Sequence, residues 1–128
     1  MTSLTDLHLM IAQDFPIDQT DLGKEALKTS NLFIKYIKIF SDEKIKLELF
    51  SKKLKSLQAE KRIYYSGQAD PSVYQAKPFG VKIKTEGGIQ KYIDSDPDVI
   101  ALENKMIIQN EIVAVLFGVM DEIKRRGF

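Results

Sequence analysis

A helical fold is most clearly indicated by residues 47–65, LELFSKKLKSLQAEKRIYY. Spacings of three and four residues alternate along this stretch, which places the recurring positions on one side of an α-helix. These positions are Leu47, Phe50, Leu54, Leu57, Lys61 and Tyr64. A heptad-like seam of this kind is typical of a helix that packs lengthwise against another helix. We therefore expect a mainly α-helical protein with three to four helices and heptad-like packing.

Basic residues occupy the side of this helix that faces away from the seam. With about 100° of rotation per residue, four cations fall within about 80° of one another. They are Lys44, Lys52, Lys55 and Arg62. Lys61 occupies the seam itself, where its aliphatic stem can lie along Leu57 and Tyr64 while the ammonium group emerges at the helix end. The neighbouring cations Lys61 and Arg62 are therefore expected to have different surroundings.

Two aromatic residues, Tyr64 and Tyr65, follow these cations at the end of the helical pattern. Cations neutralise phosphates and flat rings stack on unpaired bases, so this combination is typical of a site for single-stranded nucleic acid. The helical rotation makes Arg62 and Lys55 the first candidates for phosphate contact, and Tyr65 a better stacking candidate than Tyr64. Basic residues also stabilise helix C-termini, so a solvated helix end whose tyrosines cover the core explains the same residues.

The total charge of +1 hides an uneven distribution along the chain. Residues 1–23 contain four Asp and no Lys or Arg, residues 24–62 have a net charge of +6, and residues 63–128 have a net charge of −1. The basic middle is expected to bind a polyanion. Alternatively, the acidic N-terminal arm, residues 1–17, lies on the basic helix and compensates its charge within the chain.

Capping residues mark the helices of the N-terminal half. Ser3 can cap a helix over residues 3–13, which the Phe15-Pro16 pair ends. A second helix is expected from Asp18 onward, within a basic helical region that extends to residue 65. The cluster Ser41-Asp42-Glu43 again resembles a cap, so this helix either breaks there or restarts.

Glycine and proline interrupt the pattern over residues 66–94, which we expect to be irregular. Residues 81–85 alternate apolar and basic side chains as a strand does, and Glu86-Gly87-Gly88 can turn the chain into a second strand over residues 89–93. The insertion at about 78–93 is therefore either a β-hairpin or an irregular segment in which residues 89–93 form a helical turn.

The last helix, residues 95–128, has the clearest boundaries. Ser95 or Asp96 caps it, Pro97 suits its first turn, and the basic residues near its end complement the helix dipole. From Met106 onward it is apolar around most of its circumference, so it must be covered on several sides. We predict that this helix joins subunits into a homo-oligomer, although the two preceding long helices are an alternative cover. The residues predicted at the subunit interface are Met106, Val113, Leu116, Met120 and Ile123.

No motif for catalysis is evident. The sequence has no Cys and one His, His8, and it contains no Gly-rich phosphate loop or nucleophile elbow. Asp94, Asp96 and Asp98 are spaced like the first ligands of a calcium loop, but the Gly and Glu of that loop are missing, so helix capping explains them better. We expect one domain over residues 1–128 in a reducing cytosol, without catalytic residues, cofactors, metal sites or membrane spans.

Three segments, Tyr64–Gly67, Asp94–Val99 and Asp121–Phe128, are informative as a set. In this order and spacing they resemble the UvsY recombination mediators of T4-like bacteriophages, and the resemblance covers most of the chain from about Asp18 onward. It implies a non-enzymatic protein that binds single-stranded DNA without sequence specificity in the cytoplasm of the infected bacterium. It also implies a ring-like homo-oligomer of six or seven subunits, formed through the C-terminal region.

The partners implied by this resemblance are the UvsX-like phage recombinase, a RecA-like ATPase, and the phage single-strand-binding protein, whose DNA coat the recombinase must enter. The family's DNA-binding motif is a basic segment just before the two tyrosines. In this chain Lys61 occupies a matching position, and Arg62 matches the basic character of the segment. Where the family has a basic residue further upstream, this chain has Ala59 and Glu60, so Lys55 becomes a candidate substitute. The alternative function is a helical scaffold or assembly adaptor that binds only proteins. The residues predicted to bind nucleic acid are Lys44, Lys52, Lys55, Lys61, Arg62, Tyr64 and Tyr65.

Overall fold

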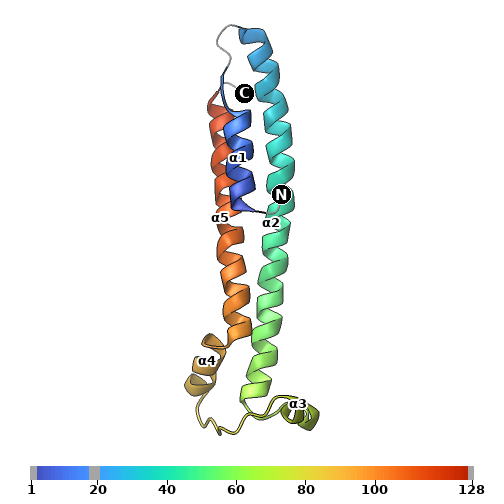
Figure 1. Ribbon diagram of the computed structural model, residues 1–128, viewed down its shortest axis with the longest axis vertical. Coiled ribbons are helices and arrows are strands. Elements are labelled where there is room, and N and C mark those ends of the chain that lie inside the picture. Colours follow the sequence, from blue (N-terminus) through green and yellow to red (C-terminus); the bar gives the residue numbers. More distant parts are fainter. Residues whose placement is uncertain (1–2, 18–20, 127–128) are drawn as a thin grey trace. The chain divides into compact units, whose positions relative to one another are not determined.

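The computed structural model describes residues 3–17 and 21–126, and within these ranges it is helical without any β-strand (Figure 1). The mainly α-helical fold class is therefore confirmed, but the predicted number of three to four helices is too low, because the described residues form five. The helices are α1 (Leu4–Asp14), α2 (Leu22–Tyr65), α3 (Pro71–Ala76), α4 (Glu86–Asp94) and α5 (Pro97–Arg125). The chain divides into two compact units: unit 1 comprises Met1–Glu48 and Ile107–Phe128, and unit 2 comprises Leu49–Met106.

Side-chain caps begin α1 and α2. Ser3 Oγ accepts a hydrogen bond from the Asp6 N–H at 3.1 Å, and Asp21 Oδ1 accepts one from the Lys24 N–H at 3.0 Å. Each of these bonds satisfies a backbone donor that the first helical turn leaves free. The first helix and its end before Pro16 are as predicted. The predicted start of the second helix, Asp18, lies outside the described residues.

Helix α2 continues through Ser41-Asp42-Glu43, so the predicted break or restart at this cluster is wrong. Glu43 does not cap a helix; its side chain points inward and is only 4% exposed. The Gln109 side-chain amide donates to both the backbone carbonyl and the carboxylate of Glu43, each at 2.9 Å. A buried carboxylate is costly without such a donor. The pair therefore favours one register between α2 and α5 in unit 1.

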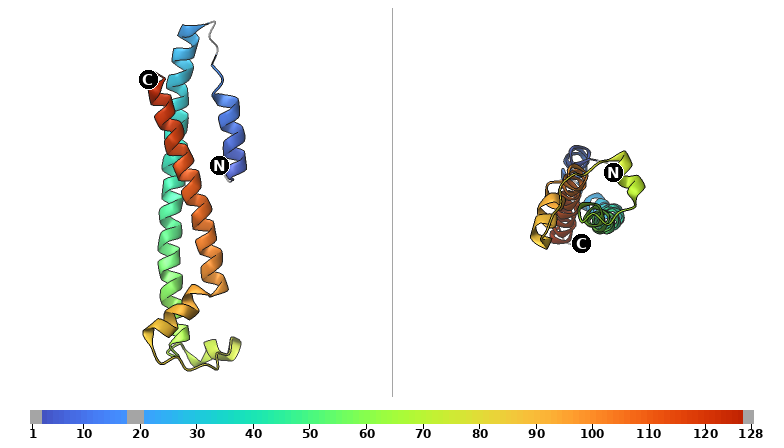
Figure 2. Two further views of the ribbon diagram at one scale, coloured as in Figure 1. Left: turned by 90° about the vertical axis from the view of Figure 1, so that its left-hand side faces the viewer. Right: turned by 90° about the horizontal axis from the view of Figure 1, so that it is seen from below.

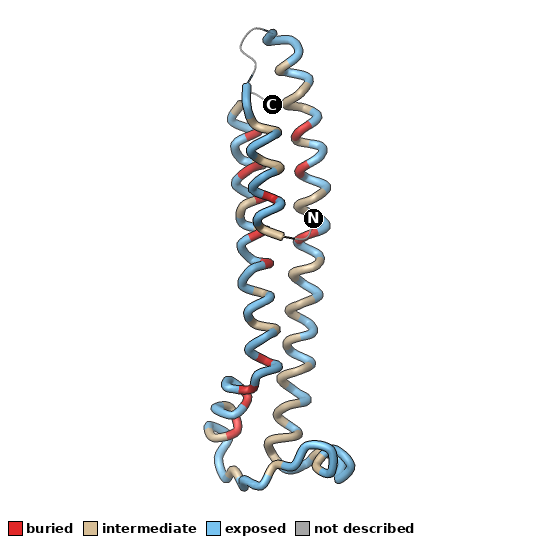
Figure 3. Tube along the Cα trace, in the orientation of Figure 1, coloured by how far each residue is buried: buried red, intermediate tan, exposed pale blue. Residues whose placement is uncertain are grey.

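The core of unit 1 is formed by α1, α2 and α5. In this unit α2 and α5 run antiparallel, and α1 packs against them (Figures 1 and 2). Buried positions recur at helical spacing along the two long helices (Figure 3). The buried core residues are Leu7, Leu32, Tyr36, Ile112, Leu116, Val119 and Ile123.

The residues predicted at a subunit interface contribute largely to this core. Leu116 and Ile123 are 0% exposed, and Met120 packs against the same cluster. Val113, in unit 1, and Met106, in unit 2, are half-buried. The large apolar α5 side chains that remain exposed in unit 1, among the described residues, are Ile107, Ile108 and Phe117. Substituting Leu116 or Ile123 would therefore disturb the folded subunit itself, and the exposed apolar side chains are better probes of assembly.

The acidic N-terminal helix compensates part of the basic helix within unit 1. Asp14 Oδ2 lies 2.6 Å from Lys35 Nζ and accepts a hydrogen bond from the Tyr36 hydroxyl at 2.9 Å. Lys28 Nζ donates to the Pro16 carbonyl at 2.6 Å. Burial, reinforced by Asp14, raises the pKa of Tyr36. These contacts agree with the intramolecular interpretation of the charge pattern for Lys28 and Lys35, which are not among the predicted DNA-binding residues.

The β-hairpin predicted at about 78–93 is wrong, because residues 86–94 form α4. Thr85 Oγ1 accepts a hydrogen bond from the Gly88 N–H at 3.0 Å and caps this helix. Ile89 and Ile93 lie one helical turn apart and are both buried, whereas Lys91 is exposed. In a strand, all three side chains would share one face. They pack with Leu54, Leu57, Tyr65, Ile83 and Val99.

The segment expected to be irregular, residues 66–94, also contains α3. Asp70 caps α3 by accepting a hydrogen bond from the Ser72 N–H at 3.0 Å, and Pro71 occupies its first position. Gly88 permits the approach of the preceding loop to α4, since a Cβ atom at this position would lie 2.7 Å from Ile83 Cγ2. Unit 2 is therefore more helical than the frequency of glycine and proline indicated.

Candidate nucleic-acid interface

The candidate site lies at the C-terminal end of α2, which Gly67 terminates. The Gly67 N–H donates to the Tyr64 carbonyl at 3.2 Å, and the Gln68 N–H donates to the Ile63 carbonyl at 3.1 Å. This pair of bonds is a Schellman motif, which requires a left-handed residue. Gly67 has a φ of 80°, which glycine adopts without strain. The motif ends α2 directly after the cations and tyrosines singled out in the sequence.

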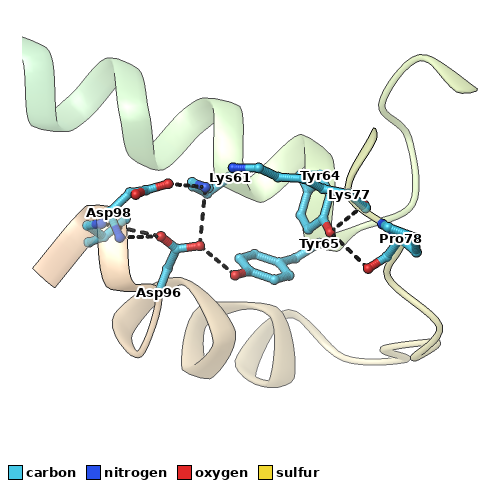
Figure 4. Close-up of polar contacts among 8 residues, drawn as sticks. Lys61, Tyr64, Tyr65, Lys77, Pro78, Asp96 and Asp98 are labelled. Carbon is cyan, nitrogen blue, oxygen red and sulfur yellow. Dashed lines mark hydrogen bonds and ion pairs between the residues drawn. The ribbon is translucent and has the colours of Figure 1, made fainter. Parts of the chain in front are cut away.

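Lys61 is held by two carboxylates at the start of α5 (Figure 4). Its Nζ lies 2.9 Å from Asp98 Oδ2 and 3.3 Å from Asp96 Oδ2, and its side chain is 16% exposed. Burial opposes the charged form, but the hydrogen bond to Asp98 and the charge of Asp96 outweigh it and raise the pKa of Lys61. The ammonium group at the seam is therefore neutralised within unit 2.

Asp96 organises this side of the helix end. Its Oδ1 accepts hydrogen bonds from the backbone N–H groups of Asp98 and Val99, at 2.9 and 3.3 Å, so the predicted capping role is confirmed. Its Oδ2 accepts a hydrogen bond from the Tyr65 hydroxyl at 2.5 Å (Figure 4). Burial opposes ionisation of Asp96, but the bonds from Tyr65 and the backbone, together with Lys61, lower its pKa. Burial and the bond to Asp96 raise the pKa of Tyr65.

Tyr64 and Tyr65 belong to a cluster of aromatic rings in unit 2. The rings of Tyr64 and Tyr74 are stacked, with centroids 5.3 Å apart, and the Tyr64 hydroxyl donates to the Lys77 carbonyl at 2.8 Å (Figure 4). Tyr65 meets Phe79 edge to face at 5.0 Å. Tyr92 contacts both Tyr65 and Phe79. Both predicted stacking residues thus have a packing role, which agrees with the interpretation that the tyrosines cover the core.

Sequence reasoning missed three members of this cluster, Tyr74, Phe79 and Tyr92. They lie on α3, on the following loop and on α4, so no common period joins them to the seam of α2. Their aromatic character, in a segment rich in glycine and proline, was the available signal. Edge-to-face and offset ring contacts stabilise such clusters beyond simple burial.

Arg62 has different surroundings from Lys61, as predicted. Its guanidinium group pairs with Glu86 on α4 and donates a hydrogen bond to Gln90 Oε1. Gln90 Nε2 donates in turn to Asp94 Oδ1 at 2.7 Å. The Arg62 side chain is 40% exposed. Its Nη1 atom, which pairs with Glu86, is itself buried, so the guanidinium is oriented by α4 and a phosphate can meet Nη1 only in place of the Glu86 carboxylate.

Two open pockets flank the end of α2 within unit 2. The first, which we call the acidic pocket, has a volume of about 590 Å³ and is lined by Lys61, Tyr64 and Tyr65 on α2. Its lining also contains Lys77 and four carboxylates, so phosphate groups are disfavoured there. These carboxylates belong to Glu60, Asp70, Asp96 and Asp98.

The second pocket, which we call the basic pocket, has a volume of about 690 Å³. Lys55 and Arg62 both line it, so two residues of the predicted basic stripe come together here. Among the residues that the structure describes, Glu86 is the only acidic side chain in this lining. The predicted cluster of cations and tyrosines is thus divided between one pocket that disfavours phosphate and one that favours it.

The other predicted cations lie further back along α2. Lys52 is exposed one turn before Lys55 and belongs to unit 2. Lys44 is also exposed, belongs to unit 1, and has its Nζ 5.9 Å from the centroid of the Phe40 ring. Of the predicted cations, the described structure therefore joins Lys55 and Arg62 at the basic pocket, with Lys52 adjacent to Lys55 on the helix.

A family model described as "Recombination, repair and ssDNA binding protein UvsY" matches residues 10–128. The chain belongs to the UvsY family. This finding confirms the resemblance that the three sequence segments indicated, and it assigns the chain to a phage family of recombination, repair and single-stranded-DNA-binding proteins.

The UvsY fold is also found in two solved structures. The crystal structure of the bacteriophage T4 recombination mediator protein UvsY in lattice type II matches with a TM-score of 0.86 and 24% identity, over 100% of this chain and 90% of that chain. Lattice type IV of the same protein gives a TM-score of 0.85 and 24% identity, over 99% and 91%. A search of curated protein sequences gave no match.

Two further searches concern residues 3–17 and 21–126 alone. Within these ranges, no group of three or more His, Asp or Glu side chains is arranged to hold a metal ion. None of the helices there combines the length and the apolar character that crossing a membrane requires.

Proposed function

We propose that this UvsY-family chain binds single-stranded DNA without sequence specificity, and that the basic pocket of unit 2 is the centre of its DNA site. The observation that carries the proposal is the position of Lys55 and Arg62 on one open pocket, with the Arg62 side chain oriented by α4 and 40% exposed. Lys52, one turn before Lys55, extends this surface along α2. The description of the family as single-stranded-DNA-binding supports the same function.

The chemistry of the pocket accounts for binding that ignores sequence. Ammonium and guanidinium groups contact phosphates, which are the same at every nucleotide. Ile63 lines both pockets and is 50% exposed, so it offers an apolar surface beside the cations on which a base can rest. Tyr64 and Tyr65 support the site by fixing the end of α2 through the aromatic cluster.

In this proposal Arg62 contacts DNA, and Lys61 acts mainly on stability. Lys61 is already paired with Asp96 and Asp98 and is largely buried. Replacing Lys61 with Met leaves two carboxylates without their shared cation, so it should lower the free energy of unfolding more than Arg62→Met does. Arg62→Met should weaken DNA binding more than Lys61→Met does. The reverse order in either measurement would assign the DNA contact to Lys61.

The cellular role in our proposal is recombination mediation. The chain helps to load a RecA-like phage recombinase onto DNA covered by the phage single-strand-binding protein, in the cytoplasm of the infected bacterium. A homo-oligomer of six or seven subunits, joined through α5, repeats the basic pocket, and linked weak sites gain up to about 10²–10⁴ in avidity without new contacts. Ile107, Ile108 and Phe117, which are 65%, 54% and 64% exposed, are available for such an assembly.

Salt-dependent titration of a labelled oligonucleotide tests the DNA site. Each phosphate contact that is lost reduces the slope of log affinity against log salt by about 0.7 for a single strand. We therefore expect the Lys55→Met/Arg62→Met variant to bind more weakly and with a slope reduced by about 1.4 per subunit. Lys105→Met, which removes an exposed cation of unit 2 outside the pocket, is the matched control. Binding that is absent at low salt, or independent of salt, would refute the site.

A second candidate function, a scaffold that binds only proteins, is favoured by the packing of both tyrosines and by the exposed apolar residues of α5. The two functions are distinguished by the recombinase itself. On DNA coated with the single-strand-binding protein, the parent chain should shorten the lag before the DNA-dependent ATPase activity of a RecA-like recombinase appears. If the Lys55→Met/Arg62→Met variant shortens the lag equally well, the scaffold function is the correct one.

A further inference from the structure

The carboxylate of Glu86 occupies the place at which a phosphate would meet Arg62. It pairs with the Arg62 guanidinium and is the only acidic group among the described residues of the basic pocket. The side chain of Glu86 is 73% exposed, so the carboxylate lies on the open side of the pocket. A carboxylate and a phosphate oxygen are interchangeable partners for a guanidinium fork.

The position of Glu86 is set by the fold of α4. Glu86 is the first residue of this helix, directly after its cap Thr85, and Ile89 and Ile93 hold the helix in the core of unit 2. Gln90, one turn after Glu86, accepts a second hydrogen bond from the guanidinium. Arg62 is therefore held by two α4 residues, Glu86 and Gln90, which lie one helical turn apart on the same face.

The ion pair between Arg62 and Glu86 is weak enough to be exchanged. The Glu86 side chain is 73% exposed and the Arg62 side chain 40% exposed, so water screens the pair from the Glu86 side although Arg62 Nη1 itself is buried. A DNA strand supplies several phosphates and releases its counterions when cations bind it. A phosphate can therefore displace the carboxylate from Arg62, but the displaced carboxylate remains near the strand and repels it.

We propose that Glu86 is an affinity-determining residue of the DNA site, which holds Arg62 when DNA is absent and yields it to a phosphate when DNA binds. This inference rests on the proposed function. Its consequence is a lowered affinity at each subunit, so that tight binding requires several subunits on one strand and a single contact is readily released.

Glu86→Gln tests this role in the full-length protein with a labelled oligo(dT) as the probe. The amide keeps the shape of the side chain but removes the charge that competes with phosphate. We expect the affinity to rise about threefold to tenfold at low salt, given the strength of exposed ion pairs and of charge repulsion near DNA. The salt dependence should also become steeper, because binding no longer frees a carboxylate that takes up a cation from solution.

Two further variants separate this role from a general change in charge. Glu60→Gln removes one negative charge two residues from Arg62, but Glu60 lines the acidic pocket. The affinity of this variant for oligo(dT) should therefore differ less than twofold from that of the parent chain. In an Arg62→Met background, Glu86→Gln should raise the affinity no more than Glu60→Gln does. Circular dichroism checks that α4 and the remaining helices are retained in each variant.

The outcomes distinguish the inference from the function on which it rests. If the parent chain binds oligo(dT) but Glu86→Gln leaves the affinity unchanged or lowers it, the inference is overturned and the DNA site stands. An equal gain from Glu60→Gln, or a gain that persists without Arg62, also overturns it, since the effect is then one of overall charge. If the parent chain does not bind oligo(dT) at all, both the function and the inference fail.

Discussion

In unit 1, three helices bury aliphatic side chains against one another, and the enclosed polar contact is the pair of Glu43 and Gln109. In unit 2, aromatic rings and charged groups surround the end of α2, and Asp96 alone joins Lys61, Tyr65 and a helix cap. Among the residues that the structure describes, the apolar core of unit 2 is smaller, with three buried residues against seven in unit 1. Polar contacts therefore carry a larger share of the stability of unit 2.

This difference has consequences for function. Apolar burial carries no charge for salt to screen or for pH to titrate, and it suits the part of the chain that supplies structure. A network of exposed and half-buried charges responds to salt, to pH and to a polyanion. The candidate DNA site lies in the unit whose charged groups can exchange partners. Substitutions in the two units should thus differ in the size of their effects and in how those effects depend on conditions.

The largest effect is expected from Leu116→Ala in the core of unit 1. Leu116 is 0% exposed, and removing a buried Leu side chain leaves a cavity that costs about 3 kcal/mol. Urea unfolding followed by circular dichroism should show the loss. The control is Glu122→Ala, because Glu122 is exposed on the same helix and its removal should cost less than about 0.5 kcal/mol. Equal losses at the two positions would contradict the burial assigned to α5.

A slightly smaller effect is expected from Gln109→Leu, which removes the amide donor of the buried Glu43 carboxylate. At neutral pH this should cost about 2–3 kcal/mol, because a charge stays in the core with less compensation. The double variant Glu43→Leu/Gln109→Leu should recover most of the loss, since both polar partners are then gone. A double variant as unstable as the single one would show that the pair contributes through packing alone.

Unit 2 should lose about 1–2 kcal/mol in Tyr65→Phe, and the loss should depend on pH. The pKa of Asp96 is lowered in the folded state, so its contribution is complete above the usual Asp pKa of about 4 and is lost as the pH falls through the folded-state pKa. The parent chain should therefore lose stability below about pH 4. Tyr65→Phe should lose less in this range, because one bond that lowers the pKa of Asp96 is gone.

At alkaline pH the same variant tests the hydroxyl. The pKa of Tyr65 is raised by folding, so its contribution is complete below the usual Tyr pKa of about 10 and is lost as the pH rises through the folded-state pKa. The parent chain and Tyr65→Phe should therefore converge in stability above about pH 10. If the free energies of unfolding of the parent chain and of Tyr65→Phe differ by the same amount from pH 3 to pH 11, the bond between Tyr65 and Asp96 is ruled out.

The sequence predicted the long helices well because their apolar residues keep one period over many turns. The seam residues of α2 from Leu47 to Tyr64 are all half-buried, and the exposed lysines lie off the seam, as the rotation required. Capping residues located two helix starts, at Ser3 and Asp96, whereas the cap of α2 in the described residues is Asp21 and the sequence pointed to Asp18. Predictions from capping residues hold in the folded chain because a cap depends only on nearby backbone groups.

Prediction failed where distant contacts override local patterns. Glu43 resembles a cap in sequence, yet Gln109, far along the chain, draws it into the core and α2 continues. Residues 81–85 alternate like a strand and suggested a second strand over residues 89–93, yet the helical alternative holds there because Ile89 and Ile93 then pack together against Leu54 and Leu57 of α2. At the candidate site, rotation separated Arg62 from Lys61, but their carboxylate partners on α4 and α5 carried no recognisable signal.

The smallest effect is expected from the exposed pair of Arg125 and Asp121 in unit 1. The two groups lie 3.1 Å apart, one helical turn apart in sequence, with side chains 73% and 51% exposed. Arg125→Met should cost less than about 0.5 kcal/mol, and this small loss should disappear in high salt. Lys61→Met should cost more and keep most of its effect in salt, because Lys61 is only 16% exposed and its partner Asp96 only 5% exposed. Equal costs would mean that ion pairs in the two units do not differ in strength, and that any sensitivity of unit 2 to salt and pH comes from the residues of the basic pocket alone.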